Sequence, residues 1–147
     1  MPGFTSTRPN LEADGPTLDI IIRPPILMLQ ALAAGPSGQM VPATQVQAVA
    51  MVDTGAQGTV ITPAIAQQLG LQPTGSALAG GATGHAPVSA NVYNVDIIFG
   101  AGVLVPNVAV MELPLAGQKI QALIGRDILR HGMLIYLGHA NQFTLGF

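Results

Sequence analysis

Short apolar runs, separated by glycine, proline and small polar residues, are the dominant pattern along the chain. They occupy residues 18–22, 26–33, 45–52, 88–99, 103–111 and 133–137. Runs of this length, bounded by turn-forming residues, are typical of strands in all-β folds rather than of long helices. We therefore expect an all-β domain in which each run forms a strand. Asp96, between Val95 and Ile97, is expected to face solvent.

Two segments predict short helices instead. In residues 63–69, Thr62 can act as N-cap, Pro63 occupies the first helical position and Gly70 ends the pattern. Residues 127–131, followed by Gly132, fit a second short helix.

Composition along the chain suggests an N-terminal segment followed by one domain. Residues 1–16 combine proline and glycine with small polar residues, so we expect a flexible N-terminal lead-in. The remaining segment, 17–147, is long enough for one domain with its own core and too short for two. Residues 74–87 are rich in glycine and small residues and read either as a flexible hairpin or as a linker.

Composition narrows the set of partners. Only 8% of residues are charged and 49% are hydrophobic, so burial of part of the surface against a second copy is expected. The net charge of -2 and the lack of a Lys/Arg cluster exclude nucleic acid as an expected partner. No apolar run reaches the length of about 20 residues that spans a bilayer, so a soluble protein without membrane contact is expected. A cytoplasmic location is favoured because no signal-peptide pattern is visible.

The sequence gives little support for a metal site, a cysteine nucleophile or a serine nucleophile. The chain has no cysteine, and His85, His131 and His139 lack the spacing of metal ligands. Ser76 and Ser89 are not surrounded by a nucleophile-elbow pattern. We expect neither a metal nor a cofactor.

The strongest chemical signal is an acid at the end of an apolar strand. Residues 49–52 lead directly into Asp53-Thr54-Gly55-Ala56. A carboxylate in this position costs desolvation energy, so it is either held by the following turn or retained for function. Taken alone, the motif also fits an Asx-type turn. A second motif lies far downstream, where residues 122–124 lead into Gly125-Arg126-Asp127.

Together the two motifs resemble the retropepsin family of single-domain aspartic proteases, in which an apolar strand precedes Asp-Thr-Gly-Ala and Ile-Gly-Arg-Asp opens a later helix. The resemblance covers roughly residues 18–145. It implies a closed β-barrel of the acid-protease type, with one or two short helices, that forms a two-fold homodimer. The sequence departs from many such enzymes at Gln57, where they carry a carboxylate, and over residues 35–45, which look like a longer loop.

The resemblance also implies roles for individual residues. Asp53 would be catalytic, while Thr54, Gly55 and Ala56 would support the catalytic pair and approach the substrate backbone. Structural support would come from Gly125, Arg126 and Asp127, with Arg126 paired either with Asp127 or with a main-chain carbonyl. Asp127 itself fits a helix N-cap or an ion partner. The family's substrate-covering flap would contain Gly80, Gly81, Ala82, Thr83 and Gly84.

The sequence contains one Asp-Thr-Gly, whereas hydrolysis by aspartic proteases needs two carboxylates that share a proton. The implied enzyme is therefore a homodimeric aspartic endopeptidase acting on a peptide or protein substrate. Cleavage beside apolar residues is expected, because Val60, Ile61, Leu78, Val88 and Ile124 would supply apolar pocket walls. One alternative is a catalytically silent retropepsin-like module for dimerisation or peptide binding. Another is a dimer in which residues 1–16 block the site until they are removed.

Overall fold

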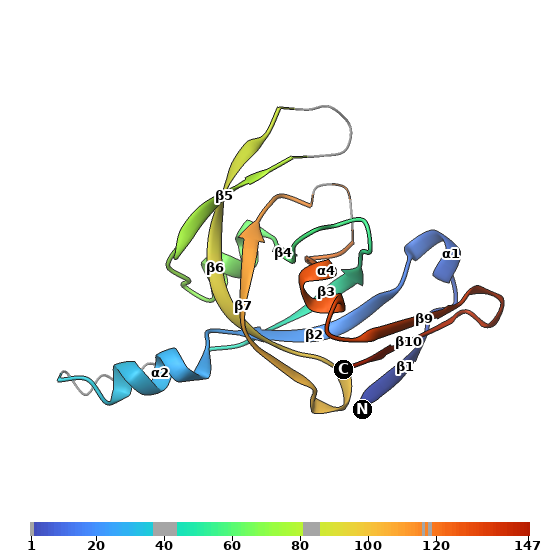
Figure 1. Cartoon of the computed structure of the whole chain (residues 1–147), viewed down its shortest axis with the longest axis horizontal. Coiled ribbons are helices and arrows are strands. Elements are labelled where there is room, and N and C mark those ends of the chain that lie inside the picture. Colours follow the sequence, from blue (N-terminus) through green and yellow to red (C-terminus); the bar gives the residue numbers. More distant parts are fainter. Residues whose placement is uncertain (1, 37–43, 81–85, 116, 118) are drawn as a thin grey trace.

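The chain folds into strands joined by turns and a few short helices (Figure 1). The computed structural model describes residues 2–36, 44–80, 86–115, 117 and 119–147. The strands are β1 (Gly3–Thr7), β2 (Thr17–Arg23), β3 (Val46–Val52), β4 (Val60–Ile61), β5 (Gly75–Ala79), β6 (Val88–Ile98), β7 (Leu104–Glu112), β8 (Ala122–Ile124), β9 (Met133–Leu137) and β10 (Gln142–Gly146). The helices are α1 (Leu11–Asp14), α2 (Ile26–Ala33), α3 (Pro63–Gln68) and α4 (Arg126–Leu129), with single 3-10 turns η1 (Gly100–Gly102) and η2 (Gly138–Ala140). The predicted all-β class is confirmed.

Most strands form one sheet that closes on itself. Its order is β2-β3-β8-β4-β7-β6-β5, and β2 also pairs with β6. The first six strands of this order therefore form a closed ring, with β5 attached outside it, as expected for a barrel. Alternate residues of β3 show how the barrel is filled: Val46, Ala48, Ala50 and Val52 are buried, whereas the residues between them are not.

Two parallel pairings bring distant parts of the sequence together. Strand β3 runs parallel to β8 with Val52 opposite Ile124, and β4 runs parallel to β7 with Ile61 opposite Glu112. Because parallel strands end at the same edge, the residues that follow Val52 and Ile124 emerge side by side. This register places the two sequence motifs next to each other.

The two ends of the chain form a second, three-stranded sheet in the order β1-β10-β9. The β9–β10 hairpin contains residues 133–137, one of the runs predicted to be a strand. Residues 3–14, however, were expected in a flexible lead-in and instead form β1 and α1. Strand β1 hydrogen-bonds along β10, and the side chain of Leu11 is fully buried in the core. Backbone pairing to an otherwise open edge and burial of one leucine order a segment whose composition alone suggested mobility.

Residues 26–33 were expected to be a strand, and this prediction is wrong because they form α2. Leucine, methionine, glutamine and alanine dominate this run, and all four have high helix propensity. The helix extends away from the barrel (Figure 1), and Leu27 and Met28 are 70% and 50% exposed. Among the helices within the described ranges, none combines the length and the apolar character needed to cross a membrane.

Asp96 lies in the barrel wall and is only 1% exposed, so the prediction that it faces solvent is also wrong. Its carboxylate accepts hydrogen bonds from the backbone N–H groups of Ile26 (3.1 Å) and Asn107 (3.0 Å). Nε of Arg23 lies 3.4 Å from the same carboxylate. These three donors compensate for the burial of the charge and tie the start of α2 to β6 and β7.

The remaining local predictions concern helices and the glycine-rich hairpin. Helix α3 begins at Pro63 after Thr62, and Gly70 follows it with a left-handed φ of 60°, as predicted. Helix α4, expected over residues 127–131, spans Arg126–Leu129 and has Arg130 as its C-cap. Strands β5 and β6 pair from Gly75–Val92 to Ala79–Val88, which confirms a hairpin over this part of the chain. Gly81, Ala82, Thr83 and Gly84, expected in its tip, lie outside the described residues, as does His85.

Candidate active site

The loop after β3 and the segment after β8 are joined by backbone hydrogen bonds. The N–H of Asp53 donates to the carbonyl of Ile124 at 3.0 Å. Further along, the N–H of Arg126 donates to Ala56 at 3.0 Å, and that of Asp127 donates to Gln57 at 3.2 Å. The Asp-Thr-Gly-Ala motif and the Gly-Arg-Asp motif therefore form one structural unit.

Within this unit, the carboxylate of Asp53 is oriented by the turn that follows it. Its Oδ1 accepts hydrogen bonds from the backbone N–H groups of Gly55 (2.8 Å) and Ala56 (3.2 Å). Among the described residues, none donates to Oδ2, and the side chain is half-buried. One oxygen is thus held in place while the other remains available to a reacting molecule. The Asx-type turn and a chemical role are compatible at this residue.

Small and exposed residues surround the carboxylate. A Cβ at Gly55 would lie 3.1 Å from Oδ1 of Asp53, so glycine permits the tight turn. Thr54 is exposed, and no hydrogen bond to its hydroxyl is found within the described ranges. Ala56 is half-buried. The loop therefore presents one face that a second molecule can approach.

Arg126 is exposed and contacts the loop through main-chain carbonyls. Its Nη1 donates to the carbonyl oxygens of Thr54 (2.8 Å) and Gly55 (3.2 Å). Of the two partners that the sequence allowed, the structure selects the main-chain carbonyls. A charged donor to two adjacent carbonyls restrains the loop without any carboxylate at position 57.

Asp127 binds Thr59, a residue that the sequence analysis did not single out. The carboxylate accepts from both the backbone N–H (2.9 Å) and the hydroxyl (2.8 Å) of Thr59, and also from the N–H of Ile128 (2.9 Å). The N–H of Gly125 donates to the hydroxyl oxygen of Thr59 at 3.2 Å. Gly125 is the N-cap residue of α4, so Asp127 is not its N-cap. The position of Thr59 directly before the apolar pair Val60-Ile61 could have indicated this contact. A hydroxyl group beside a buried strand needs a hydrogen-bond partner.

Gly125 allows the two motifs to approach closely. A Cβ at this position would lie 2.5 Å from the carbonyl carbon of Gly58 and 2.6 Å from its oxygen. Both atoms belong to backbone, which cannot move aside as a flexible side chain can. Any other residue would push the loop and α4 apart.

Of the five residues expected to form apolar pocket walls, three are buried and two are exposed. Ile61 and Ile124 are fully buried in the barrel core and Val60 is 3% exposed, so these residues do not line an open surface. Leu78 and Val88 are exposed on the β5–β6 hairpin, whose exposed residue Gly80 follows β5. The pockets beside α1 and α3 do not include Asp53 within the described part of the chain.

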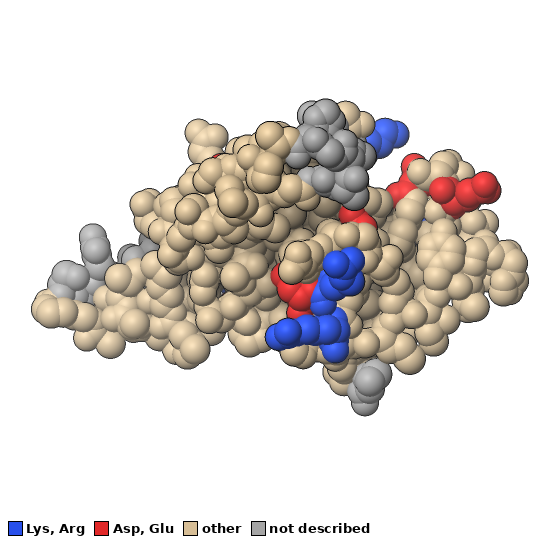
Figure 2. Space-filling model, turned by 45° about the horizontal axis from the view of Figure 1, so that its top comes forward, with Lys and Arg blue, Asp and Glu red and all other residues tan. Residues whose placement is uncertain are grey.

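The chain carries few charged side chains, five basic and seven acidic. Figure 2 shows a surface that is mostly uncharged, with a few separate groups of acidic and basic side chains. Over the residues that the structure describes, no group of three or more His, Cys, Asp or Glu side chains is arranged to hold a metal ion.

Comparisons with solved structures show limited similarity. A retropepsin-like aspartic protease from Rickettsia conorii is 18% identical, with a TM-score of 0.45, and the match covers 100% of this chain and 96% of that one. The retroviral protease-like domain of Ddi1 from Leishmania major is 20% identical, with a TM-score of 0.43 and coverage of 67% and 78%. The EIAV protease, complexed with an inhibitor, is 23% identical, with a TM-score of 0.38 and coverage of 58% and 76%. A search among curated proteins found no match.

A family model gives the decisive comparison. The model described as aspartyl protease matches residues 40–128, more than half of the 147-residue chain. The matched segment includes both Asp53 and the Gly125-Arg126-Asp127 motif that the structure joins to it. The chain therefore belongs to the aspartyl protease family.

Proposed function

We propose that this chain is an aspartic endopeptidase whose active unit is a homodimer, with one Asp53 from each subunit. The observation that carries the proposal is the state of Asp53. One carboxylate oxygen is held by two backbone N–H groups, and the other accepts no bond from the described residues. In an aspartyl protease family chain with a single Asp-Thr-Gly, a second copy is the simplest source of the second acid.

The chemistry needs two carboxylates that share one proton. The ionised Asp53 takes a proton from water, whose oxygen attacks the peptide carbonyl carbon, while the protonated Asp53 of the other subunit donates to the carbonyl oxygen. The tetrahedral intermediate then breaks its C–N bond as the departing nitrogen receives the proton that the first Asp53 took from water, and the other Asp53 recovers its proton from a hydroxyl of the intermediate. Two close carboxyl groups share one proton at low cost, so we expect activity under acidic conditions.

Features of the single chain support dimerisation. Thr54 is exposed beside Asp53, where its hydroxyl could reach the matching loop of a second copy. The terminal sheet carries an apolar row on alternate residues of β9: Met133, Ile135 and Leu137 are 44%, 40% and 37% exposed. Across the sheet, Ile135 lies opposite Thr144, which is also uncharged. An uncharged, partly apolar sheet face suits contact with another subunit.

The β5–β6 hairpin supports a preference for apolar substrates. Leu78 is 74% exposed and Val88 is 61% exposed, on adjacent strands near the tip of the hairpin. Leu78 pairs with Ser89 and Val88 with Ala79, so the two apolar side chains lie on opposite faces of the hairpin. As a flap over bound substrate, the hairpin would place one of them against a peptide, and glycines such as Gly80 would allow it to open.

The test is cleavage of casein or a peptide library between about pH 3 and 7 by the wild type and by Asp53→Asn. We expect cleavage by the wild type and none by the variant, with unchanged circular dichroism. Asp19→Asn is the matched control, because Asp19 is an exposed acid on β2 and should not affect cleavage. Undiminished cleavage by Asp53→Asn would refute the proposal. A wild type that dimerises and binds peptide without cleaving it would identify a silent binding module instead.

A further inference from the structure

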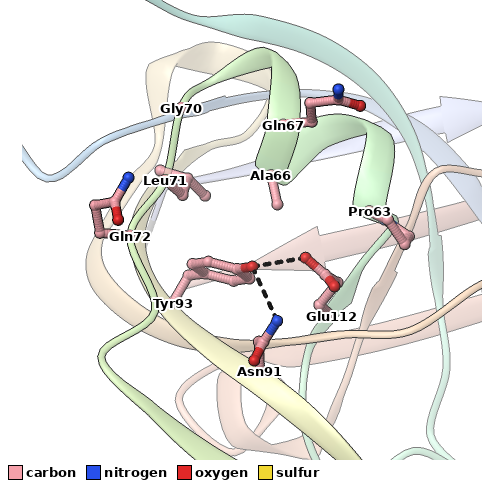
Figure 3. A pocket seen from close by; sticks show the side chains of 9 residues that line it. All are labelled: Pro63, Ala66, Gln67, Gly70, Leu71, Gln72, Asn91, Tyr93 and Glu112. Carbon is pink, nitrogen blue, oxygen red and sulfur yellow. Dashed lines mark hydrogen bonds between the residues drawn. The ribbon is translucent and has the colours of Figure 1, made fainter.

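A pocket of about 370 Å³ lies between α3 and the base of the β5–β6 hairpin (Figure 3). Its lining residues come from α3 and the turn after it, from β6 and from the end of β7: Pro63, Ala66, Gln67, Gly70, Leu71, Gln72, Asn91, Tyr93 and Glu112. The volume falls within the range of small-molecule sites. Glu112 pairs with Ile61 of β4, and none of the described residues that line the pocket belongs to the Asp53 loop.

One end of the pocket is a polar network on β6 and β7. The hydroxyl of Tyr93 donates to Oε2 of Glu112 at 2.7 Å, and Nδ2 of Asn91 donates to the Tyr93 hydroxyl at 3.4 Å. The hydrogen bond to Glu112, together with burial, raises the pKa of Tyr93, so its hydroxyl stays a neutral donor. Figure 3 shows both polar side chains directed toward that hydroxyl.

The carboxylate of Glu112 has a hydrogen-bond donor on only one of its two oxygens among the described residues. Within the described residues, Oε1 accepts no hydrogen bond and no Lys or Arg forms an ion pair with this group. The side chain is half-buried, so water screens its charge less than at an open surface. A partly buried anion with a free oxygen favours a cation as guest.

The other end of the pocket is apolar. Figure 3 shows Ala66 and Leu71 pointing from α3 and the following turn into the space beside the Tyr93 ring. Pro63 closes the side near Glu112, while Gln67 and Gln72 are exposed at the rim. A guest with a charged head and a short alkyl stem would match both ends.

We propose that this pocket binds an alkylammonium group, either from a free amine or from a lysine side chain. An ammonium can donate to the free Oε1 of Glu112 while its alkyl carbons contact Leu71 and Ala66. A guanidinium is a poorer match, because its planar fork binds both oxygens of a carboxylate and Oε2 already accepts from Tyr93. A divalent metal would need more oxygen ligands than this single carboxylate supplies. The guest would contact both α3 and β6 and so connect the helix to the hairpin base.

The experiment is an NMR titration of the full chain at neutral pH and low salt. The probes are n-butylammonium chloride, Nα-acetyl-lysine N-methylamide and, as a neutral match for the latter, Nα-acetyl-norleucine N-methylamide. We expect saturable shifts of the backbone amides of Gly70, Leu71 and Asn91 with the charged probes only. Binding of n-butylammonium alone would assign a free amine, and tighter binding of the lysine derivative would assign a peptide side chain. Equal binding of the norleucine derivative, or no saturable shift with either cation, would overturn the proposal.

Variants locate the binding group. Glu112→Gln keeps the shape and should weaken the binding of charged probes at least about tenfold. Gln67→Lys puts a tethered ammonium at the rim and should block the probes without touching the core. Gln68→Lys is the matched control, because it adds the same charge to the neighbouring exposed position of α3, outside the pocket lining. If Gln67→Lys and Gln68→Lys reduce binding equally, general electrostatics and not this pocket is responsible, and the proposal fails.

Discussion

Thr59 and Asp127 are joined by two hydrogen bonds, in which the backbone N–H and the hydroxyl of Thr59 donate to the two oxygens of one carboxylate at 2.9 and 2.8 Å. Thr59 is fully buried and lies just before β4, whereas Asp127 lies in α4. The pair therefore links the end of the Asp53 loop to the helix that carries Arg126.

Replacement of Asp127 by alanine should destabilise the fold. Both donors of the buried Thr59 would lose their acceptor, so we expect the free energy of unfolding to fall by about 2–3 kcal/mol. Urea denaturation measures this change, with Asp19→Ala as the control for removal of an exposed acid. Equal stability of the two variants would show that the Thr59 donors find another acceptor.

Gly125→Ala should be among the most damaging small substitutions in the chain. The new Cβ would lie 2.5 Å from the carbonyl carbon of Gly58, and relief of this clash requires backbone movement in the Asp53 loop. We expect a loss of about 2–3 kcal/mol in thermal or urea unfolding, together with loss of cleavage activity. Gly75→Ala is the control, because a Cβ there meets no atom within 4 Å, and it should change stability by less than about 0.5 kcal/mol. Similar stabilities for both variants would contradict the packing argument.

Arg126→Lys should loosen the Asp53 loop while it preserves the charge. Lysine is shorter and lacks the rigid guanidinium whose Nη1 donates to the carbonyls of both Thr54 and Gly55. Amide hydrogen exchange at Gly55 and Ala56 should accelerate about tenfold, a readout that does not depend on catalysis. Arg130→Lys, at the exposed end of the same helix, should leave those two amides unchanged. Unaltered exchange in Arg126→Lys would show that the loop is held without this side chain.

The Tyr93–Glu112 contact predicts a specific dependence on alkaline pH. The pKa of Tyr93 is raised above 10.0 in the folded state by the hydrogen bond to Glu112, by burial and by the nearby negative charge. Its contribution to stability is therefore complete below pH about 10 and is lost as pH rises through the folded-state pKa. The chain has two tyrosines, so Tyr136→Phe leaves Tyr93 as the sole phenol for titration by ultraviolet absorbance. We expect a midpoint above 10.0 that moves down in Glu112→Gln, and a midpoint at or below 10.0 would contradict the contact.

The proposed dimer makes a prediction for the terminal sheet. Ile135→Asp places a charge in the apolar row on β9, and desolvation of that charge in both subunits should dissociate the dimer and abolish cleavage. Sedimentation velocity, with and without a peptide-mimicking inhibitor, measures the effect. Leu104→Asp, at a site with similar 42% exposure on β7, should leave the dimer intact. Persistence of the dimer in Ile135→Asp would exclude this face as the interface.

The sequence by itself determined the elements whose signals are local. Apolar runs bounded by turn residues predicted β3, β6 and β9, and Thr62, Pro63 and Gly70 predicted α3. The resemblance of the Asp53 motif and the Gly125-Arg126-Asp127 motif to those of retropepsins also indicated an aspartic protease family, and the family model confirmed it. Such signals survive in the sequence because side-chain alternation, capping and turn formation depend on neighbouring residues.

Only the tertiary structure decided the features that depend on partners distant in sequence. Arg126 donates to the carbonyls of Thr54 and Gly55, and Thr59 hydrogen-bonds to Asp127. Asp96 is buried and accepts from Asn107. These contacts form because barrel closure brings together residues that are distant in the sequence. Residues 3–7 likewise form a strand because their backbone pairs with the edge of β10. Local patterns record which face of an element is apolar, but the identity of the partner is set when the sheet closes and each buried polar group must be satisfied.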